Sequence, residues 1–591
     1  TAQQHTITDY SNQAMAYRAM PTTTIRDNNP FLYTDPDNPY AVPVTVLPDG
    51  GIYERTDFSM LSYDFRATAS YNKEFNGGHI MNLFGGMELN AVDREKTWFN
   101  GVGMQYDLGM LPSYDYQYFK QGNEENAQYY SVTRTRQRQV AFFGTGTYSY
   151  MGKYTLNGTV RYEGSNKLGK SRTARWLPTW NVSAAWNAHD EEFWQSFRHI
   201  FSNMSLKASY SLTADRGPAS VSNSKAIIYS YNSWRPFTSA QESGLTIYDI
   251  ENSELTYEKK HELNIGAELG FVDNRINLAV DWYTRNNFDL IGVINTKGVG
   301  GQITKLANVA SMKSSGIEFT LSTKNIQTKD FTWNTNFIFS HAENTVTDLE
   351  SNSSVMNMIS GSGFAMEGYP VRSLFSLNFQ GLNESGYPTF INEKGKLTVS
   401  DINFQEQMRK GHLVYEGPTD PTITGSFGNV FKYKGFTLNI FITYSFGNVI
   451  RLDPAFSSRY SDLDAMPREF INRWTTGGDE KYTTVPVIAD RRANQKDPYL
   501  SYAYNAYNYS TERVAKGDFI RMKEISLAYN FPKTVVSKLK ISDLSLKLQA
   551  TNPFLIYCDK KLNGQDPEFF NTGGVASPIP QQFTFTLKLG I

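Results

Sequence analysis

Long runs of alternating apolar and polar residues constrain the fold of this chain more than any other feature. One run covers residues 582–591, and others cover 262–271, 275–285, 436–446 and 543–550. Successive side chains of a β-strand point to opposite faces of the sheet. Each run therefore predicts a strand with one apolar face and one polar face.

The length of these runs indicates a membrane protein. Each has about 9–11 residues, the length that a tilted strand needs to cross a bilayer, whereas strands of soluble proteins usually have about 5–6 residues. Further candidate strands lie at 52–74, 77–95, 128–151, 153–166, 176–188, 203–214, 306–326, 330–347, 371–382, 423–434 and 517–530. The sequence therefore predicts an all-β fold, a transmembrane antiparallel β-barrel with roughly 16 strands in this chain.

The connections between the candidate strands come in two lengths that tend to alternate. Short turns lie at 76–78, 151–153, 273–274, 327–329 and 434–435. Long segments lie at 96–127, 215–254, 350–370 and 451–515. Outer-membrane barrels have short periplasmic turns and long extracellular loops. We therefore expect residues 51–591 to form a barrel portion, and residues 1–50 to form an extracellular loop or segment preceding a strand.

Composition agrees with a barrel. Aromatic residues make up 14% of the chain, with 37 Tyr and 38 Phe, and a tyrosine at a membrane interface keeps its ring in the apolar layer and its hydroxyl in water. The mean hydropathy of −0.46 is that of a polar protein, but alternation hides the apolar face of a barrel from such averages. A net charge of −1 leaves no basic footprint for nucleic acid.

No arrangement of residues typical of catalysis stands out, so we expect neither an enzyme nor a cofactor. The 7 histidines form no HxH or HExxH pair, and we expect no metal site. Cys558 is the only cysteine, which excludes an internal disulfide. Residues 1–20 carry no basic-then-apolar signal peptide, so we expect a mature chain, a processed chain or a piece of a longer one.

Aromatic clusters in the long loops are the best candidates for substrate contact, because aromatic faces stack on sugar rings or peptide side chains at low conformational cost. The candidates are Trp98, Tyr106, Tyr114, Tyr116, Tyr118, Trp234, Arg235, Tyr502, Tyr504 and Tyr507. The alternative is that these residues belong to the outer aromatic girdle or pack the loops together. Charged residues on the polar strand faces, such as Glu262 and Arg285, are expected to face the lumen, since a charge facing lipid at mid-depth is costly.

Several sequence segments resemble one family. Residues 252–259 read NSELTYEK and residues 263–271 read LNIGAELGF. Residues 161–169 read RYEGSNKLG, and residues 517–532 read GDFIRMKEISLAYNFP. Shorter matches are GYPVRS at 368–373, TNPF at 551–554 and DPE at 566–568. Their order and spacing, from about residue 50 to the end, resemble SusC/RagA TonB-dependent outer-membrane transporters.

The resemblance implies a barrel of about 22 strands with a plugged lumen and a TonB box. It also implies a SusD-like surface lipoprotein that closes the extracellular mouth as a lid, a dimer of transporter–lid pairs, and import of oligosaccharides or peptides. No segment before residue 50 resembles a plug domain. We therefore expect the chain to be the C-terminal part of the barrel. The plug and first strands would then be a separate chain or a missing segment, and the TonB complex would act through the plug.

Two other classes of function remain open at this stage. One is a passive porin, or a structural barrel that serves as an adhesin or secretion conduit. The other is a secreted β-sandwich or propeller enzyme that degrades polysaccharide. A large steady single-channel current favours the porin, and extraction without detergent favours the secreted enzyme.

Overall fold

The fold is that of a computed structural model, which describes the following residues: 2–9, 32–33, 37–38, 40–41, 44–45, 51–105, 108–109, 111–112, 116, 119, 129–168, 171–217, 226–232, 243–295, 298, 304–350, 353–460, 466–539, 541–570 and 579–590.

Within the described residues, the largest element is a 17-stranded sheet. Its strands are β1 (Ala2–Asp9), β4 (Gly51–Phe75), β5 (His79–Gln105), β6 (Leu111–Pro112), β7 (Tyr130–Tyr150), β8 (Tyr154–Ser165), β9 (Trp176–Asn187), β10 (Phe201–Asp215), β13 (Glu258–Phe271), β14 (Ile276–Asn295), β15 (Thr304–Gln327), β16 (Phe331–Leu349), β22 (Ile423–Tyr433), β23 (Phe436–Phe446), β26 (Phe519–Asn530), β27 (Asp543–Cys558) and β28 (Gln582–Gly590). Each long strand pairs antiparallel with the next long strand of this series.

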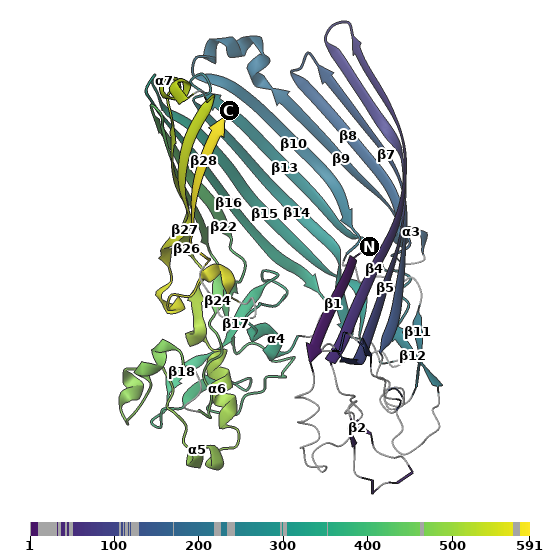
Figure 1. Ribbon diagram of the computed structural model, residues 1–591, viewed down its shortest axis with the longest axis vertical. Coiled ribbons are helices and arrows are strands. Elements are labelled where there is room, and N and C mark those ends of the chain that lie inside the picture. Colours follow the sequence, from purple (N-terminus) through teal and green to yellow (C-terminus); the bar gives the residue numbers. More distant parts are fainter. Residues whose placement is uncertain are drawn as a thin grey trace.

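The series curves into the wall of a barrel whose front is open in Figure 1, between β28 on one side and β1 and β4 on the other. This confirms the all-β, antiparallel barrel. The sheet has 17 strands, and β6 has only two residues, so the count of roughly 16 membrane strands is also confirmed. The sheet also begins before residue 51, because Ala2–Asp9 forms β1 and pairs with β4. The segment 1–50 therefore contains a wall strand of its own.

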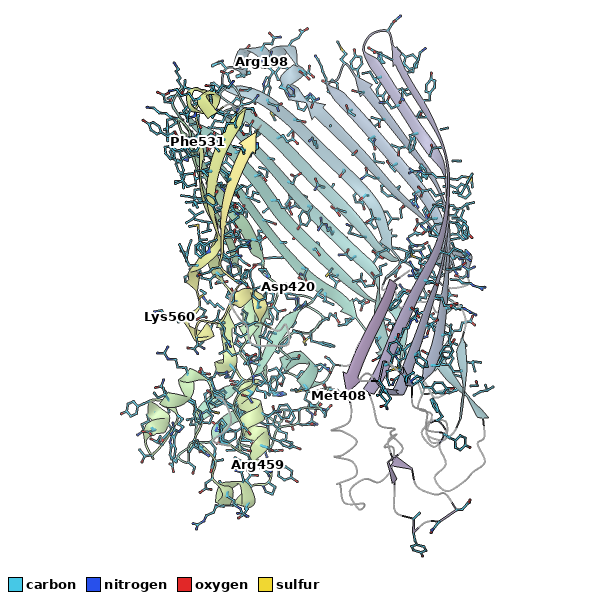
Figure 2. The ribbon with its side chains drawn as sticks, in the orientation of Figure 1. Arg198, Met408, Asp420, Arg459, Phe531 and Lys560 are labelled. Atoms are coloured by element: carbon cyan, nitrogen blue, oxygen red, sulfur yellow. The ribbon has the colours of Figure 1, made fainter. Side chains whose placement is uncertain are left out.

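Short and long connections lie at opposite ends of the wall, as the sequence predicts (Figure 1). The β4–β5 turn is short because Gly77 and Gly78 adopt φ values of 89° and 78°, which other residues rarely adopt. The end with short connections, near Arg198 and Phe531 in Figure 2, is the periplasmic end, and the end near Met408 and Arg459 is extracellular. None of the helices in the described part of the chain is long and apolar enough to cross a membrane.

The periplasmic connections hold a few short helices. The β9–β10 connection has the 3-10 helices η1 (Ala188–Asp190) and η2 (Glu192–Phe197), and the β26–β27 connection has α7 (Lys533–Val536) and η7 (Ser537–Leu539). Other short elements are β2 (Leu32–Tyr33), β3 (Val44–Thr45), α3 (Arg172–Arg175), β11 (Ile227–Asn232), β12 (Ser243–Asp249), η8 (Lys560–Leu562) and η9 (Pro567–Phe569).

The connection between β16 and β22 and the connection between β23 and β26 fold together into a small domain. This domain lies at the extracellular end, at the lower left of Figure 1. We call residues 353–421 and 447–518 the extracellular domain. Its elements are α4 (Val355–Ile359), β17 (Ser373–Leu377), β18 (Phe379–Leu382), β19 (Pro388–Ile391), β20 (Leu397–Thr398), β21 (Leu413–Pro418), β24 (Val449–Arg451), η4 (Arg468–Asn472), η5 (Asp479–Lys481), α5 (Arg491–Lys496), α6 (Leu500–Asn508), η6 (Thr511–Arg513) and β25 (Val514–Lys516). A core that includes Ile359, Phe390 and Leu500 joins the two connections.

The predicted wall strand at 371–382 is wrong. This segment forms β17 and β18, which pair with β21 and β19 inside the extracellular domain. All five residues of β17 are buried, so both of its faces are covered by protein. An alternating sequence pattern does not distinguish such a short core strand from part of a membrane strand.

The two faces of the wall differ as the alternation predicts. On β28, Phe583, Phe585, Leu587 and Leu589 are all more than half exposed, and they point away from the lumen toward lipid. On the opposite face of the wall, charged and polar side chains pair across neighbouring strands, as in Lys207 with Glu268. Apolar groups thus meet lipid, while polar groups meet one another or water.

This assignment predicts the effect of an arginine at neighbouring positions of β9. Val182 is half exposed on the lipid face, whereas Ser183 has the opposite parity and faces the lumen. We expect Val182→Arg to lower the unfolding free energy of the barrel by about 2–4 kcal/mol, the cost of an arginine in lipid near mid-depth. Denaturant unfolding from lipid vesicles measures this difference. Ser183→Arg is the matched control and should have a much smaller effect; equal losses would contradict the face assignment.

Candidate functional site

The lumen face of the wall carries a connected group of charges on β4, β5 and β8. Glu88 accepts from Arg161 at 2.9 Å and lies 3.3 Å from Arg66. Arg161 also contacts Glu163 at 2.8 Å, and Gln139 of β7 donates to Glu163. These side chains face the same way because the register places them at equivalent positions of the alternation. The result is a hydrated, nearly neutral polar surface.

A second group lies further along the wall, on β13 and β14. Glu262 contacts Arg285 at 3.0 Å and Lys260 at 2.7 Å. The guanidinium of Arg285 also lies 3.9 Å from the centre of the Tyr283 ring. The expectation that Glu262 and Arg285 face the lumen therefore agrees with the structure. Such paired charges can offer hydrogen bonds to a polar solute without presenting a strong net field to it.

A buried arginine joins the two connections of the extracellular domain to each other. Arg451 donates to the backbone oxygens of Ser510 and Phe375, both at 2.7 Å, and to the hydroxyl of Ser376 at 2.9 Å. Burial lowers the pKa of Arg451 to about 10, and the nearby carboxylate of Glu416 opposes that shift. The guanidinium remains charged at neutral pH, so one side chain ties both connections together.

A second buried arginine fixes the β27–β28 connection over the wall. Arg521 of β26 donates to both carboxylate oxygens of Asp566, at 2.6 and 2.8 Å, and both side chains are buried. Glu568 lies 2.8 Å from the same nitrogen. One guanidinium nitrogen makes all of these contacts, and each is a hydrogen bond or ion pair between charged groups. The connection is therefore held close to the lumen face at the mouth.

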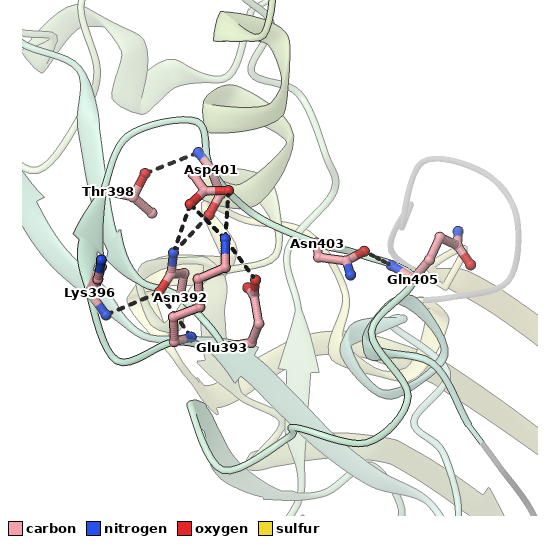
Figure 3. Close-up of polar contacts among 8 residues, drawn as sticks. Asn392, Glu393, Lys396, Thr398, Asp401, Asn403 and Gln405 are labelled. Atoms are coloured by element: carbon pink, nitrogen blue, oxygen red, sulfur yellow. Dashed lines mark hydrogen bonds and ion pairs between the residues drawn. The ribbon is translucent and has the colours of Figure 1, made fainter.

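A polar pocket of about 600 Å³ opens on the extracellular domain. Figure 3 shows polar contacts beside it, in which Asn392 donates to the Asp401 carboxylate at 3.2 Å. The ammonium of Lys394 lies 3.1 Å from the same carboxylate. Glu406 also lines the pocket, and backbone N–H groups of Met408 and Arg409 lower the pKa of its carboxyl.

Lysine and carboxylate groups side by side suit a polar ligand that presents both donors and acceptors. Within the described residues, no group of three or more His, Cys, Asp or Glu side chains is placed to hold a metal ion.

Two of the predicted substrate-contact residues lie inside the core of the extracellular domain. Tyr504 and Tyr507, on α6, are 1% and 2% exposed. The hydroxyl of Tyr504 donates to the backbone oxygen of Val487, and the ring of Tyr507 packs edge-on against Phe456 at 5.0 Å between ring centres. Their predicted substrate contact is therefore wrong for this structure, because no face of either ring is free for a ligand.

The other candidates have different environments. Tyr502 is 45% exposed on the opposite side of α6, and Tyr116 is 77% exposed. Trp98 lies on β5, and its indole N–H donates to Glu54 at 2.6 Å. Tyr106, Tyr114, Tyr118, Trp234 and Arg235 lie outside the described residues. The structure therefore leaves Trp98, Tyr116 and Tyr502 as accessible or partly accessible candidates, on different elements.

The burial of Tyr504 and Tyr507 has a signal in the sequence. Leu500, Ala503, Tyr504 and Tyr507 recur at the spacing i, i+3, i+4 and i+7, which is the apolar face of a helix. The lumen groups centred on Arg161 and Glu88 were missed for another reason. Their partners lie on strands far apart in sequence, so only the register between strands brings them together.

Comparison with known proteins assigns this chain to a family. The family described as "TonB dependent receptor-like, beta-barrel" matches residues 2–465. The chain belongs to that family. Its wall therefore lies in the outer membrane, as predicted. Members of the family are transport proteins rather than enzymes, which confirms that the chain is not an enzyme.

Relatives and solved structures agree with the predicted resemblance. TonB-dependent receptor P3 of Formosa agariphila is 23% identical over 89% of this chain and 51% of its own length. TonB-dependent receptor SusC of Bacteroides thetaiotaomicron is 24% identical over 77% of this chain and 44% of its own length. The structure of the RagAB peptide transporter has a TM-score of 0.74 at 21% identity, over 94% of this chain and 58% of that one. The chain spans about half the length of the curated relatives it matches.

The positions of two α6 tyrosines predict opposite effects of the same substitution. Tyr504→Ala should lower the unfolding free energy of the extracellular domain by about 3–5 kcal/mol, because a large buried ring is lost and a cavity remains. Tyr502→Ala should leave stability within about 0.5 kcal/mol, as for most exposed sites. Thermal unfolding combined with limited proteolysis of the domain measures both. A stable Tyr504→Ala variant would show that the ring does not support the core.

Proposed function

We propose that this chain supplies the C-terminal part of the wall of a TonB-dependent nutrient importer. Membership of the receptor family and the lumen lined by paired charges support this proposal. The single observation that carries it is the two-faced wall, apolar toward lipid and polar toward the lumen. Such a wall separates a hydrated path from the membrane.

In the proposed importer, further strands and a plug complete the barrel. β1 and β28 end the series of paired strands, and an unpaired strand edge in a bilayer leaves backbone groups without hydrogen bonds. An N-terminal portion, either a separate chain or a preceding segment, would cover these edges and bring a plug into the lumen. The TonB complex would then act on the plug.

The proposed substrates are oligosaccharides or peptides. Both present many hydrogen-bonding groups, which the paired charges of the lumen can satisfy, and both carry faces that stack on aromatic rings. Tyr116 and Tyr502 are exposed, and Tyr502 stands in the extracellular domain. The solved RagAB structure that this chain resembles is called a peptide transporter, which supports peptides as one of the two classes.

The proposed partner is a SusD-like surface lipoprotein that closes the mouth as a lid, in a dimer of transporter–lid pairs. The likeness to SusC and to the RagAB structure supports this partner. The extracellular domain offers it a firm surface, because the buried Arg451 holds its two connections together.

A growth and uptake assay tests the proposal. Deleting the gene should abolish growth on one oligosaccharide or peptide source and leave growth on simple sugars and amino acids unchanged, because those molecules pass through general pores. Restoring the gene with Tyr116→Ala and Tyr502→Ala should raise the half-saturating concentration for uptake several-fold. Tyr482→Ala, at another exposed tyrosine of the domain, is the matched control. Unchanged growth of the deletion strain on every source would refute import.

A further inference from the structure

The polar pocket of about 600 Å³ on the extracellular domain holds more negative than positive charge. Three carboxylates and two cations line it, so the two cations leave one negative charge unbalanced. The charged lining residues are Glu393, Lys394, Asp401, Glu406 and Arg409. A recess with this lining attracts a group that brings positive charge.

Both cations of the pocket interact mainly with carboxylates other than Glu393. The ammonium of Lys394 lies 3.1 Å from Asp401 but 3.7 Å from Glu393. Backbone N–H groups, and less strongly the charge of Arg409, lower the pKa of Glu406. The unbalanced negative charge of the pocket is therefore centred on Glu393.

The Glu393 carboxylate also lacks a hydrogen-bond donor. Its side chain lines the pocket and is only 6% exposed. Its Oε2 atom is buried and has no hydrogen-bond partner in the part of the chain that the structure describes. Burial lowers the pKa of the nearby His412 more than the charge of Glu393 raises it, so His412 is neutral at neutral pH. Because an unsatisfied buried acceptor is costly, a ligand that donates to Glu393 gains stability from that contact.

The loop that carries Glu393 is held in place by its own polar contacts. Asn392 accepts from the N–H groups of Lys394 and Lys396, both at 3.0 Å. It also donates to the Asp401 carboxylate at 3.2 Å. Figure 3 shows the side chains of Glu393 and Asp401 pointing toward one another. Little conformational freedom in this loop therefore remains to be lost when a ligand binds.

We propose that this pocket binds a primary ammonium group of a peptide, with Glu393 as its acceptor. The proposal rests on the proposed import function, in which peptides are one of the two substrate classes, and it names the group that the extracellular domain recognises. A primary ammonium is a compact donor, which suits the single free oxygen of Glu393. A guanidinium fork is best matched by two acceptor oxygens.

The second cation of the pocket favours a peptide over an amino sugar. Arg409 is exposed, and its guanidinium donates no hydrogen bond to any other residue that the structure describes. A peptide carries carbonyl and carboxylate groups that can accept from this guanidinium while its ammonium binds Glu393. An amino sugar also presents a primary ammonium, but it has no carboxylate to pair with Arg409.

Calorimetric titration of the complete transporter with a short peptide tests the site. The peptide has a free N-terminus and one lysine, and it is compared with its N-acetylated form, with a form that has norleucine in place of lysine, and with the doubly modified form. Loss of the recognised ammonium should weaken binding about ten- to a hundred-fold, the range for a hydrogen bond to a charged group. The single modification that weakens binding shows whether the pocket takes the N-terminus or the lysine side chain.

A variant of the pocket gives the second arm of the test. Glu393→Gln removes the charge at nearly constant size and should weaken the unmodified peptide to the level of the doubly modified one. Glu384→Gln, at an exposed carboxylate in the turn between β18 and β19, is the matched control and should bind like the unaltered transporter. If Glu393→Gln fails to fold, a peptide with a photoreactive diazirine beside its ammonium should crosslink the unaltered transporter within residues 393–409.

Three results would overturn the proposal: equal binding of the doubly modified peptide, crosslinks only outside residues 393–409, or a glucosamine oligosaccharide that binds as tightly as the peptide. These results are separate from the test of import, because binding is measured without the TonB complex. Unchanged binding by Glu393→Gln would refute this role of the pocket and leave import standing. Growth of the deletion strain on every source would refute import and leave the binding result unchanged.

Discussion

The structure depends on one constraint: inside a bilayer, the N–H and C=O groups of every strand must find partners on neighbouring strands. From β4 to β27, each long strand pairs with two others, which leaves β1 and β28 as the ends of the series. The backbone therefore sets the order of the wall before any side chain is considered.

Side chains then divide according to the medium that each face meets. Alternate residues of each strand face lipid, and these are mostly aromatic and aliphatic. The residues between them face the lumen, and these include the charged groups. The lumen charges occur mostly as pairs across strands, such as Arg161 with Glu88 and Arg285 with Glu262. Pairing keeps the surface polar while limiting its net charge. A polar solute then meets many modest hydrogen-bonding partners instead of one deep electrostatic well, which favours passage over tight retention.

The sequence predicted the wall well because alternation is a local pattern and membrane strands must be long. It predicted the extracellular domain poorly, because that domain forms from two connections separated by β22 and β23. The segment 371–382 was predicted as a wall strand, but contacts with distant residues bury its β17 part on both faces. For the tyrosines of α6, the error came from treating 451–515 as a loop. A helix separates Tyr502 from Tyr504 by about 200° (100° per residue), so neighbours in sequence have opposite environments.

Two buried arginines determine how firmly the segments at the extracellular end are held. Arg451 reaches three backbone or hydroxyl oxygens on two separate segments, and Arg521 holds Asp566 with both partners buried. Removing one member of a buried ion pair such as Arg521–Asp566 costs about 3–5 kcal/mol, so this contact holds the β27–β28 connection firmly to β26. Arg451 in turn holds the two connections of the extracellular domain to each other. Tyr502, carried on a helix that packs into the core of this domain, keeps 45% of its surface exposed.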